Sequence, residues 1–82
     1  MPGYYAYILQ SSKDGNFYFG STSNLEERVA RHNRGAVTAT KHRRPLELVY
    51  YEEFDSRADA VRRERYYKAL RNPAYIRQIV KI

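Results

Sequence analysis

Several residues of the types that catalyse phosphodiester hydrolysis occur at characteristic spacings in this sequence of 82 residues. Tyr7 and Tyr18 each lie in a short aromatic run, and Arg28 follows Tyr18 by ten positions. His32 comes one helical turn after Arg28, and Glu64 is a lone acid in a basic segment further along the chain. Tyrosine and histidine can carry protons, arginine can bind a phosphate, and a carboxylate can hold a divalent metal ion. Together these residues predict metal-dependent phosphodiester hydrolysis.

Composition limits the kind of protein that can carry this chemistry. At this length we expect a single domain over residues 1–82, which buries only about 60–65% of its unfolded surface. The sequence has no cysteine, which excludes disulfides and cysteine zinc sites, so its nine tyrosines and three phenylalanines must fill the core. It has no apolar run near the ~20 residues of a membrane span, and no signal-peptide pattern at its start. We therefore expect a soluble, cytoplasmic protein.

The net charge of +6 is concentrated in two basic zones. Residues 28–44 contain no acid and residues 61–82 contain one, whereas the acids gather in residues 47–59. Such zones predict a surface for a polyanion, with nucleic acid as the first candidate. The alternative is a basic protein whose charge only keeps it soluble. The candidate nucleic-acid contacts are Arg31, Lys41, Arg43, Arg44 and Arg63.

The first part of the chain has the pattern of a hairpin followed by a helix. Residues 4–10 and 16–20 are rich in aromatic and β-branched side chains, and the Asp-Gly pair between them is a hairpin signal. Ser23 with a glutamate three residues later predicts a capped helix over about residues 24–34. Gly35 is a natural C-terminal stop for that helix.

The second part predicts one more strand and two helices. Residues 46–54 alternate as a strand, after a loop over residues 36–45. Ser56 and Asp59 open a helix that runs to about Arg71, and Asn72-Pro73 starts a last short helix. The fold class is therefore α+β: a small three-stranded antiparallel sheet flanked by helices, in the order β-β-α-β-α-α.

Two polar residues fall on the apolar face of the first predicted helix. Leu25, Arg28, Val29 and His32 share one stripe by helical spacing. Arg28 and His32 then lie at the buried seam, where a cation is costly unless it is paired. The alternative is an arginine at the margin, with its stem on apolar surface and its charge in water.

The tyrosines and Glu64 also allow two interpretations each. Tyr7 and Tyr18 lie on antiparallel neighbours, so they either converge at a site or only pack the core. Glu64 lies on the same side of its predicted helix as apolar residues. It therefore either forms an internal ion pair or is a ligand for a hard metal ion such as magnesium.

Taken together, the motifs resemble those of the GIY-YIG nuclease domain family, in its small stand-alone type. Tyr5-Ala6-Tyr7 resembles the Gly-Ile-Tyr motif and Tyr18-Phe19-Gly20 the Tyr-Ile-Gly motif. Arg28 and His32 fit the arginine and the His-or-Tyr position of the segment that follows. Residues 44–52 are similar to the family's third strand, and residues 60–64 to the helix that carries its metal-binding glutamate. Two departures are Tyr5 in place of glycine, and Ser21 where the family's repair nuclease has lysine.

The resemblance implies a mechanism in which Glu64 holds Mg²⁺ or Mn²⁺. Tyr18 or Tyr7 would accept the proton of the attacking water or bind the waters of the site. Arg28 would neutralise charge that grows on the phosphate, and His32 would be a second proton carrier or a phosphate ligand.

The implied activity is that of an endonuclease acting on DNA rather than RNA, directed by DNA structure or damage, as in DNA repair. The alternative is a catalytically weak nucleic-acid-binding module of the same fold. A recruiting protein or a homo-oligomer is left open as a partner.

Overall fold

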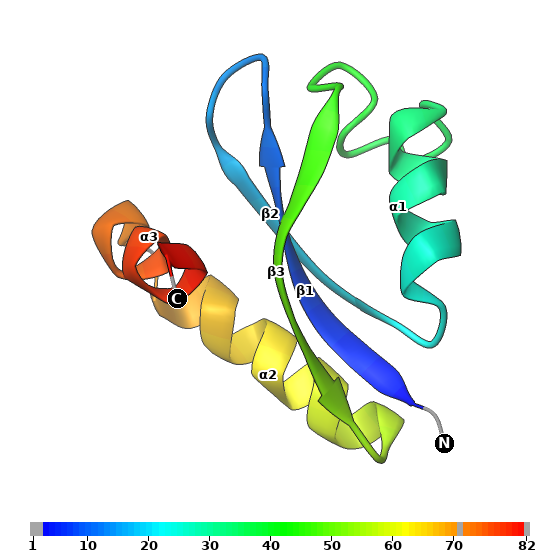
Figure 1. Cartoon of the computed structure of the whole chain (residues 1–82), viewed down its shortest axis with the longest axis vertical. Coiled ribbons are helices and arrows are strands. Elements are labelled where there is room, and N and C mark those ends of the chain that lie inside the picture. The colour runs from blue at the N-terminus through cyan, green and yellow to red at the C-terminus, as the bar shows by residue number, and fades with distance from the viewer. Residues whose placement is uncertain (1–2, 71, 82) are drawn as a thin grey trace.

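A central strand that is hydrogen-bonded on both sides organises the sheet. The computed structural model describes residues 3–70 and 72–81. The strands pair antiparallel in the order β2-β1-β3. Their bounds are Tyr4–Ser11 for β1, Phe17–Thr22 for β2 and Leu46–Phe54 for β3. The predicted α+β class and the order β-β-α-β-α-α are confirmed (Figure 1).

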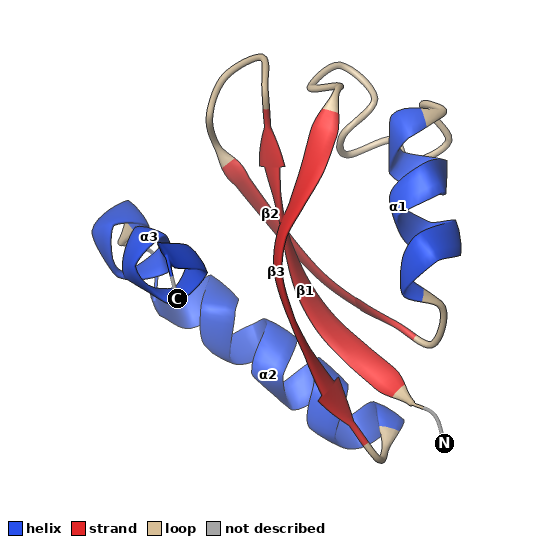
Figure 2. Cartoon of the chain, viewed as in Figure 1, coloured by secondary structure: helices blue, strands red, loops and turns tan. Residues whose placement is uncertain are grey.

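Helices cover both faces of this sheet. Their bounds are Leu25–Asn33 for α1, Arg57–Leu70 for α2 and Pro73–Lys81 for α3. Figure 2 shows α1 on one side of the strands, and α2 with α3 on the other. Within the described residues, none of the helices has the length and apolar character needed to cross a membrane.

The turn between β1 and β2 is built by the predicted Asp-Gly pair. Gly15 has a positive φ of 75°, which glycine adopts without strain, and its N–H donates to the Ser11 carbonyl over 2.9 Å. Asp14 Oδ1 accepts from the Asn16 N–H over 2.9 Å. β1 ends one residue later than predicted, because Ser11 pairs with Leu46 of β3. β2 begins one residue later and ends two residues later than predicted, because its pairing with β1 extends to Thr22 opposite Tyr5.

The predicted N-cap of α1 is wrong by one residue. Asn24, rather than Ser23, has the extended backbone of a cap, and its Oδ1 accepts from the Glu27 N–H over 3.1 Å. Both positions have a glutamate three residues later, so the sequence pattern allows either residue to be the N-cap. Only the backbone conformation shows that it is Asn24. The helix ends as predicted, since Gly35 has a φ of 82° and donates its N–H to the His32 carbonyl.

The caps of the other two helices are confirmed. Ser56 Oγ accepts from the Asp59 N–H over 3.2 Å, and Asn72 Oδ1 accepts from the Ala74 N–H over 2.9 Å. The predicted end of the second helix at Arg71 lies outside the described residues.

Alternate residues of β1 feed two separate cores, one on each face of the sheet. On the face of α2 and α3, the core contains Ala6, Ile8, Tyr67 and Ile76. On the face of α1, it contains Tyr7, Leu9 and Leu46, against which Tyr18, Leu25 and Val29 pack. Fully burying one large apolar side chain stabilises the fold by about 1.5–3 kcal/mol. Because β1 is buried on both faces, Tyr7 is fixed in a rigid part of the molecule.

Candidate active site

Tyr7 lies at the centre of the sheet, directly opposite Gly20 on β2. Its side chain is only 1% exposed. A Cβ on Gly20 would overlap the hydroxyl and ring carbons of Tyr7, the ring Cε2 lying 3.0 Å from its position. The glycine of the second motif is therefore required because the tyrosine of the first motif packs over it.

A hydrogen-bonded chain links Tyr7 to His32 and Thr40, and all three side chains are buried. The Tyr7 hydroxyl lies 3.2 Å from His32 Nε2, and His32 Nδ1 lies 2.8 Å from Thr40 Oγ1. Burial, followed by the charges of Arg28 and Arg31, lowers the pKa of His32. The imidazole is therefore neutral at neutral pH, and we assign its Nδ1–H as the donor to Thr40 and its Nε2 as the acceptor from Tyr7.

The Tyr7 phenol is protonated in this arrangement. Burial raises the pKa of Tyr7 well above its ordinary value, and the nearby Tyr18 and Glu64 raise it further. Arg28 acts in the opposite direction and lowers that pKa, because its charge stabilises a phenolate. The same guanidinium therefore influences both members of the Tyr7–His32 pair.

Tyr18 joins this cluster through its ring. The centroids of the Tyr18 and His32 rings lie 5.0 Å apart, with the rings edge to face at 63°. Tyr18 is half-buried, and its hydroxyl makes no hydrogen bond to the part of the chain that the structure describes. The hairpin thus brings both tyrosines to the face of α1, where one imidazole contacts both rings.

Arg28 supplies a cation beside these aromatic groups. It lies on α1, one turn before His32, and is half-buried. Among the described residues, no carboxylate forms an ion pair with its guanidinium. Its charge is therefore available to an anion such as a phosphate.

Glu64 reaches the same region from the opposite layer. Its carboxylate accepts a hydrogen bond from Ser21 Oγ on β2 over 2.8 Å, and forms an ion pair with Lys68 Nζ over 2.8 Å. The side chain is 19% exposed, and its charge is close enough to raise the pKa of Tyr7. The ion pair that the sequence left open thus exists, with a lysine one turn further along α2 as the partner.

The groups around Glu64 fit a metal that is held largely by substrate and water. Within the described residues, no group of three or more metal-ligating side chains is present. Mg²⁺ is commonly bound through one or two carboxylates, with water and substrate phosphates completing its coordination. Glu64 and the Ser21 hydroxyl offer hard oxygen donors of that kind. The Lys68 ammonium already occupies a cation position beside Glu64, and because Lys68 is 56% exposed, it can withdraw.

Three of the candidate nucleic-acid contacts are accessible, namely Arg31, Lys41 and Arg44. Arg43 instead braces the hairpin: its Nε is buried 3.4 Å from Asp14 Oδ2, and its Nη2 donates to the Phe17 carbonyl over 3.4 Å.

The remaining candidate, Arg63, lies on α2 and is engaged by its neighbours. Its Nε lies 3.3 Å from Glu52 Oε1, and its guanidinium lies over the Tyr66 ring, 5.0 Å from the centroid.

Three residues of the cluster were not found by sequence reasoning. In the sequence, Thr40 belongs only to the loop predicted over residues 36–45, Ser21 is only a departure from a motif, and Lys68 is one of several basic residues near Glu64. Thr40 and Ser21 act through contacts between elements, for which the sequence carries no periodic signal. Lys68 instead follows Glu64 by four residues within α2, and this helical spacing is the signal that could have identified it.

Comparisons with known proteins show the family to which this chain is similar. The family profile described as the GIY-YIG catalytic domain matches residues 3–77. A UPF0213 protein of Staphylococcus haemolyticus is 48% identical over 65 residues, which is 78% of each chain. A UPF0213 protein of Natronomonas pharaonis is 44% identical over 68 residues, covering 82% of this chain and 79% of that protein.

A solved structure is also similar. The solution NMR structure of a UPF0213 protein of Bacillus halodurans has a TM-score of 0.58 and 31% sequence identity, covering 94% of this chain and 82% of that one. Fold, paired motifs and relatives agree, and the chain belongs to the GIY-YIG family, whose domain is a nuclease fold.

Proposed function

We propose that this protein is a metal-dependent endonuclease that hydrolyses phosphodiester bonds of DNA, directed by DNA structure or damage. The observation that carries the proposal is the buried, hydrogen-bonded series Tyr7–His32–Thr40. It is flanked by Glu64 and by Arg28, which forms no ion pair within the described residues. The hydrogen bonds of the series offset the cost of burying its polar groups, and Arg28 and Glu64 add a cation and a carboxylate beside them.

The chain's own residues can move a proton away from an attacking water. The Tyr7 hydroxyl directs its proton at His32 Nε2, so its oxygen lone pairs can accept a proton from water while its own passes to the imidazole. Burial and two arginine charges disfavour the imidazolium, so His32 holds that proton only briefly before returning it. Tyr18, whose hydroxyl has no partner among the described residues, can bind and orient the water.

Arg28 and Glu64 act on the phosphate itself. Arg28 stabilises the negative charge that grows on the phosphate oxygens as water attacks. Glu64, with Ser21 beside it, would hold Mg²⁺ or Mn²⁺, which when bound supplies Lewis-acid stabilisation of charge on the phosphate and leaving oxygens. We place this activity in the cytoplasm, with a recruiting protein or a second copy as a partner.

A second candidate is a nucleic-acid-binding module of the same fold with weak catalysis. The observation that favours it is the Lys68–Glu64 ion pair, because an ammonium 2.8 Å from the carboxylate competes with a metal ion.

The test is incubation with supercoiled, nicked, branched and single-stranded DNA, and with RNA, in Mg²⁺, Mn²⁺ or chelator. We expect metal-dependent cleavage that Glu64→Gln abolishes while nucleic-acid affinity is retained. The matched control is Glu26→Gln, an exposed glutamate on α1. Binding without cleavage of any substrate would select the second candidate, and unchanged cleavage by a folded Glu64→Gln protein would refute the role of Glu64.

A further inference from the structure

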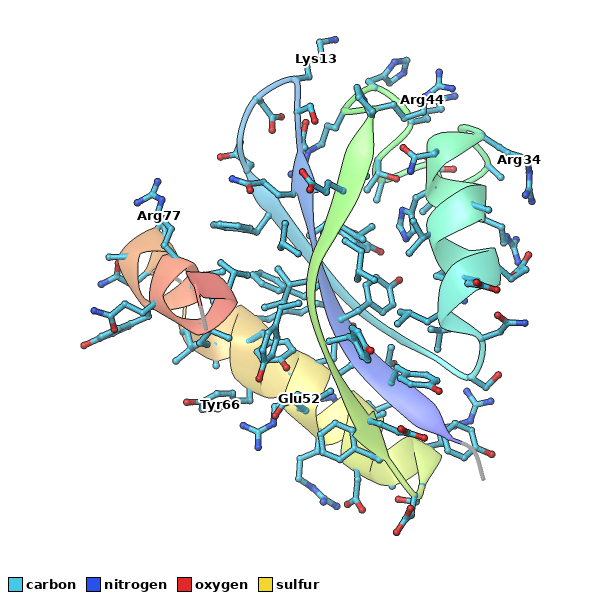
Figure 3. The ribbon with its side chains drawn as sticks, in the orientation of Figure 1. Lys13, Arg34, Arg44, Glu52, Tyr66 and Arg77 are labelled. Carbon is cyan, nitrogen blue, oxygen red and sulfur yellow. The ribbon has the colours of Figure 1, made fainter. Side chains whose placement is uncertain are left out.

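A basic hollow lies at the end of the molecule formed by the hairpin turn and the loop before β3. Its volume is about 590 Å³, and its lining residues are Lys13, Asn33, Lys41, His42, Arg44 and Pro45. Figure 3 shows Lys13 and Arg44 projecting at this same end. The lining contains three cations and no acid, which is the composition of an anion site.

Two of the three cations of the hollow, Lys13 and Arg44, are held in place without being neutralised. Lys13 Nζ donates to the His42 carbonyl over 3.2 Å, and Arg44 Nε donates to the Lys41 carbonyl over 2.8 Å. These bonds hold the side chains in place and leave the other donors of the ammonium and guanidinium available. The wall is fixed as well, because the Asn33 amide bonds both backbone groups of Leu46, its Nδ2 donating over 2.9 Å and its Oδ1 accepting over 2.7 Å.

Four cations elsewhere in the described residues form ion pairs with carboxylates, whereas others, such as Arg57 and Arg65, form none. The pairs are Arg43–Asp14, Arg62–Asp59, Arg63–Glu52 and Lys68–Glu64. Asp14, the acid next to Lys13 in sequence, is therefore already engaged by Arg43 and by the Asn16 N–H. Within the part of the chain that the structure describes, no carboxylate forms an ion pair with the cations that line the hollow.

The loop that lines the hollow also forms part of the candidate active site. Thr40 points inward to His32, and the next residue, Lys41, lines the hollow. The loop turns tightly between the two sides, since the Arg43 N–H donates to the Thr40 carbonyl over 2.8 Å. The candidate active site and the hollow therefore share one short loop.

We propose that the hollow binds a backbone phosphate of the nucleic-acid strand, away from the bond that is cleaved. The proposal rests on the proposed function for the identity of the strand, but its test needs no cleavage. The hollow supplies affinity and register, because phosphate contacts position a nucleic acid without reading its sequence.

The experiment compares two variants that each lose three positive charges. One carries Lys13→Gln, Lys41→Gln and Arg44→Gln, and the control carries Arg57→Gln, Arg65→Gln and Arg77→Gln on α2 and α3. Binding of a fluorescent DNA duplex is measured by anisotropy in chelator at several salt concentrations. We expect the slope of log affinity against log salt to flatten by roughly 2.7 in the first variant, about 0.9 for each lost contact. Equal slopes for the two variants would overturn the proposal.

The single variant Lys41→Gln covers the case in which the triple variant unfolds. No hydrogen bond or ion pair within the described residues involves the Lys41 side chain, so the fold does not depend on it. It should flatten the slope by about 0.9 on duplex DNA. An unchanged slope for this variant would count against the hollow.

Two further readouts identify the ligand and separate this proposal from the nuclease activity. Amide NMR signals of residues 41–44 should shift when inorganic phosphate binds, and an oligonucleotide should displace that phosphate. If phosphate stays bound when the DNA is also bound, the hollow is a site for free phosphate and the proposal is overturned. In cleavage assays, the triple variant of Lys13, Lys41 and Arg44 should raise KM for a long substrate more than it lowers kcat. Binding at the hollow without any cleavage refutes the nuclease and leaves this proposal standing.

Discussion

The hydrogen bond between His32 Nδ1 and Thr40 Oγ1 gives the sharpest test of the proposed proton path. Thr40→Val keeps the shape of the side chain and replaces the hydroxyl by a methyl group. Both residues are completely buried, so water cannot supply the missing partner. The imidazole then either keeps an unsatisfied Nδ1–H, or moves its proton to Nε2 and donates to Tyr7 instead.

The cost of this change follows from the burial. Leaving a buried donor unsatisfied costs about 1–3 kcal/mol, and the added methyl group returns up to about 0.8 kcal/mol. We expect a net loss of about 1–2 kcal/mol in the free energy of unfolding, which lowers the melting temperature by at least about 4 °C in a domain of this size. If Tyr7 passes its proton to Nε2, the reversed tautomer should also reduce turnover by roughly 10²-fold or more.

Three measurements check these expectations. Urea unfolding gives the stability, cleavage assays give kcat, and ¹⁵N shifts of the imidazole give its tautomer. The matched control is Thr38→Val, because Thr38 is exposed on the same loop. Wild-type stability together with an unchanged tautomer in Thr40→Val would refute the hydrogen-bonded chain. A changed tautomer with unchanged kcat would show that the Tyr7–His32–Thr40 hydrogen bonds exist but take no part in the mechanism.

Three other perturbations test separate parts of the cluster. Gly20→Ala should lower the free energy of unfolding in urea by about 1–3 kcal/mol, because its Cβ would overlap the buried Tyr7 side chain. Adding Tyr7→Phe, which removes the hydroxyl, should recover part of this loss, and an undiminished stability of Gly20→Ala would contradict the packing. Because the pKa of His32 is lowered on folding, the unfolded chain binds the proton more readily, so melting temperatures should fall as the pH drops below about 6.5. His32→Gln should weaken this dependence and His42→Asn should retain it, and the reverse pattern would exclude His32 as its source. Lys68→Met should tighten Mn²⁺ binding measured by calorimetry, because the ammonium no longer competes for Glu64; unchanged affinity would show that the ion pair is irrelevant to the metal.

The parts of the fold that were predicted from the sequence depend on local signals. The bounds of β3, Leu46–Phe54, are those predicted, because apolar and polar residues alternate between a turn and a cap. The start of α1 is off by one residue, because Ser23 and Asn24 are both good caps and both precede a glutamate at the right distance. The choice between them depends on where β2 ends, which is a tertiary property.

In the candidate site, too, some residues have a local sequence signal and others depend on tertiary contacts. Tyr7 and Tyr18 reach one face through the period of two in paired strands, and Arg28 and His32 reach it through the helical spacing of four. The separation in sequence of Ser21 and Glu64 is 43 residues, and their hydrogen bond depends on how α2 lies against β2. No periodicity encodes such a contact.

Arg43 shows why exposure could not be predicted from charge. In sequence it belongs to a Lys-His-Arg-Arg run that predicts a nucleic-acid contact, together with Arg44. In the structure its guanidinium turns toward Asp14 and the hairpin, whereas Arg44 lines the basic hollow. At this point of the loop, Arg44 is exposed and Arg43 is half-buried. The charge of the loop therefore indicates the class of ligand, and the turn of the backbone decides which side chains can bind it.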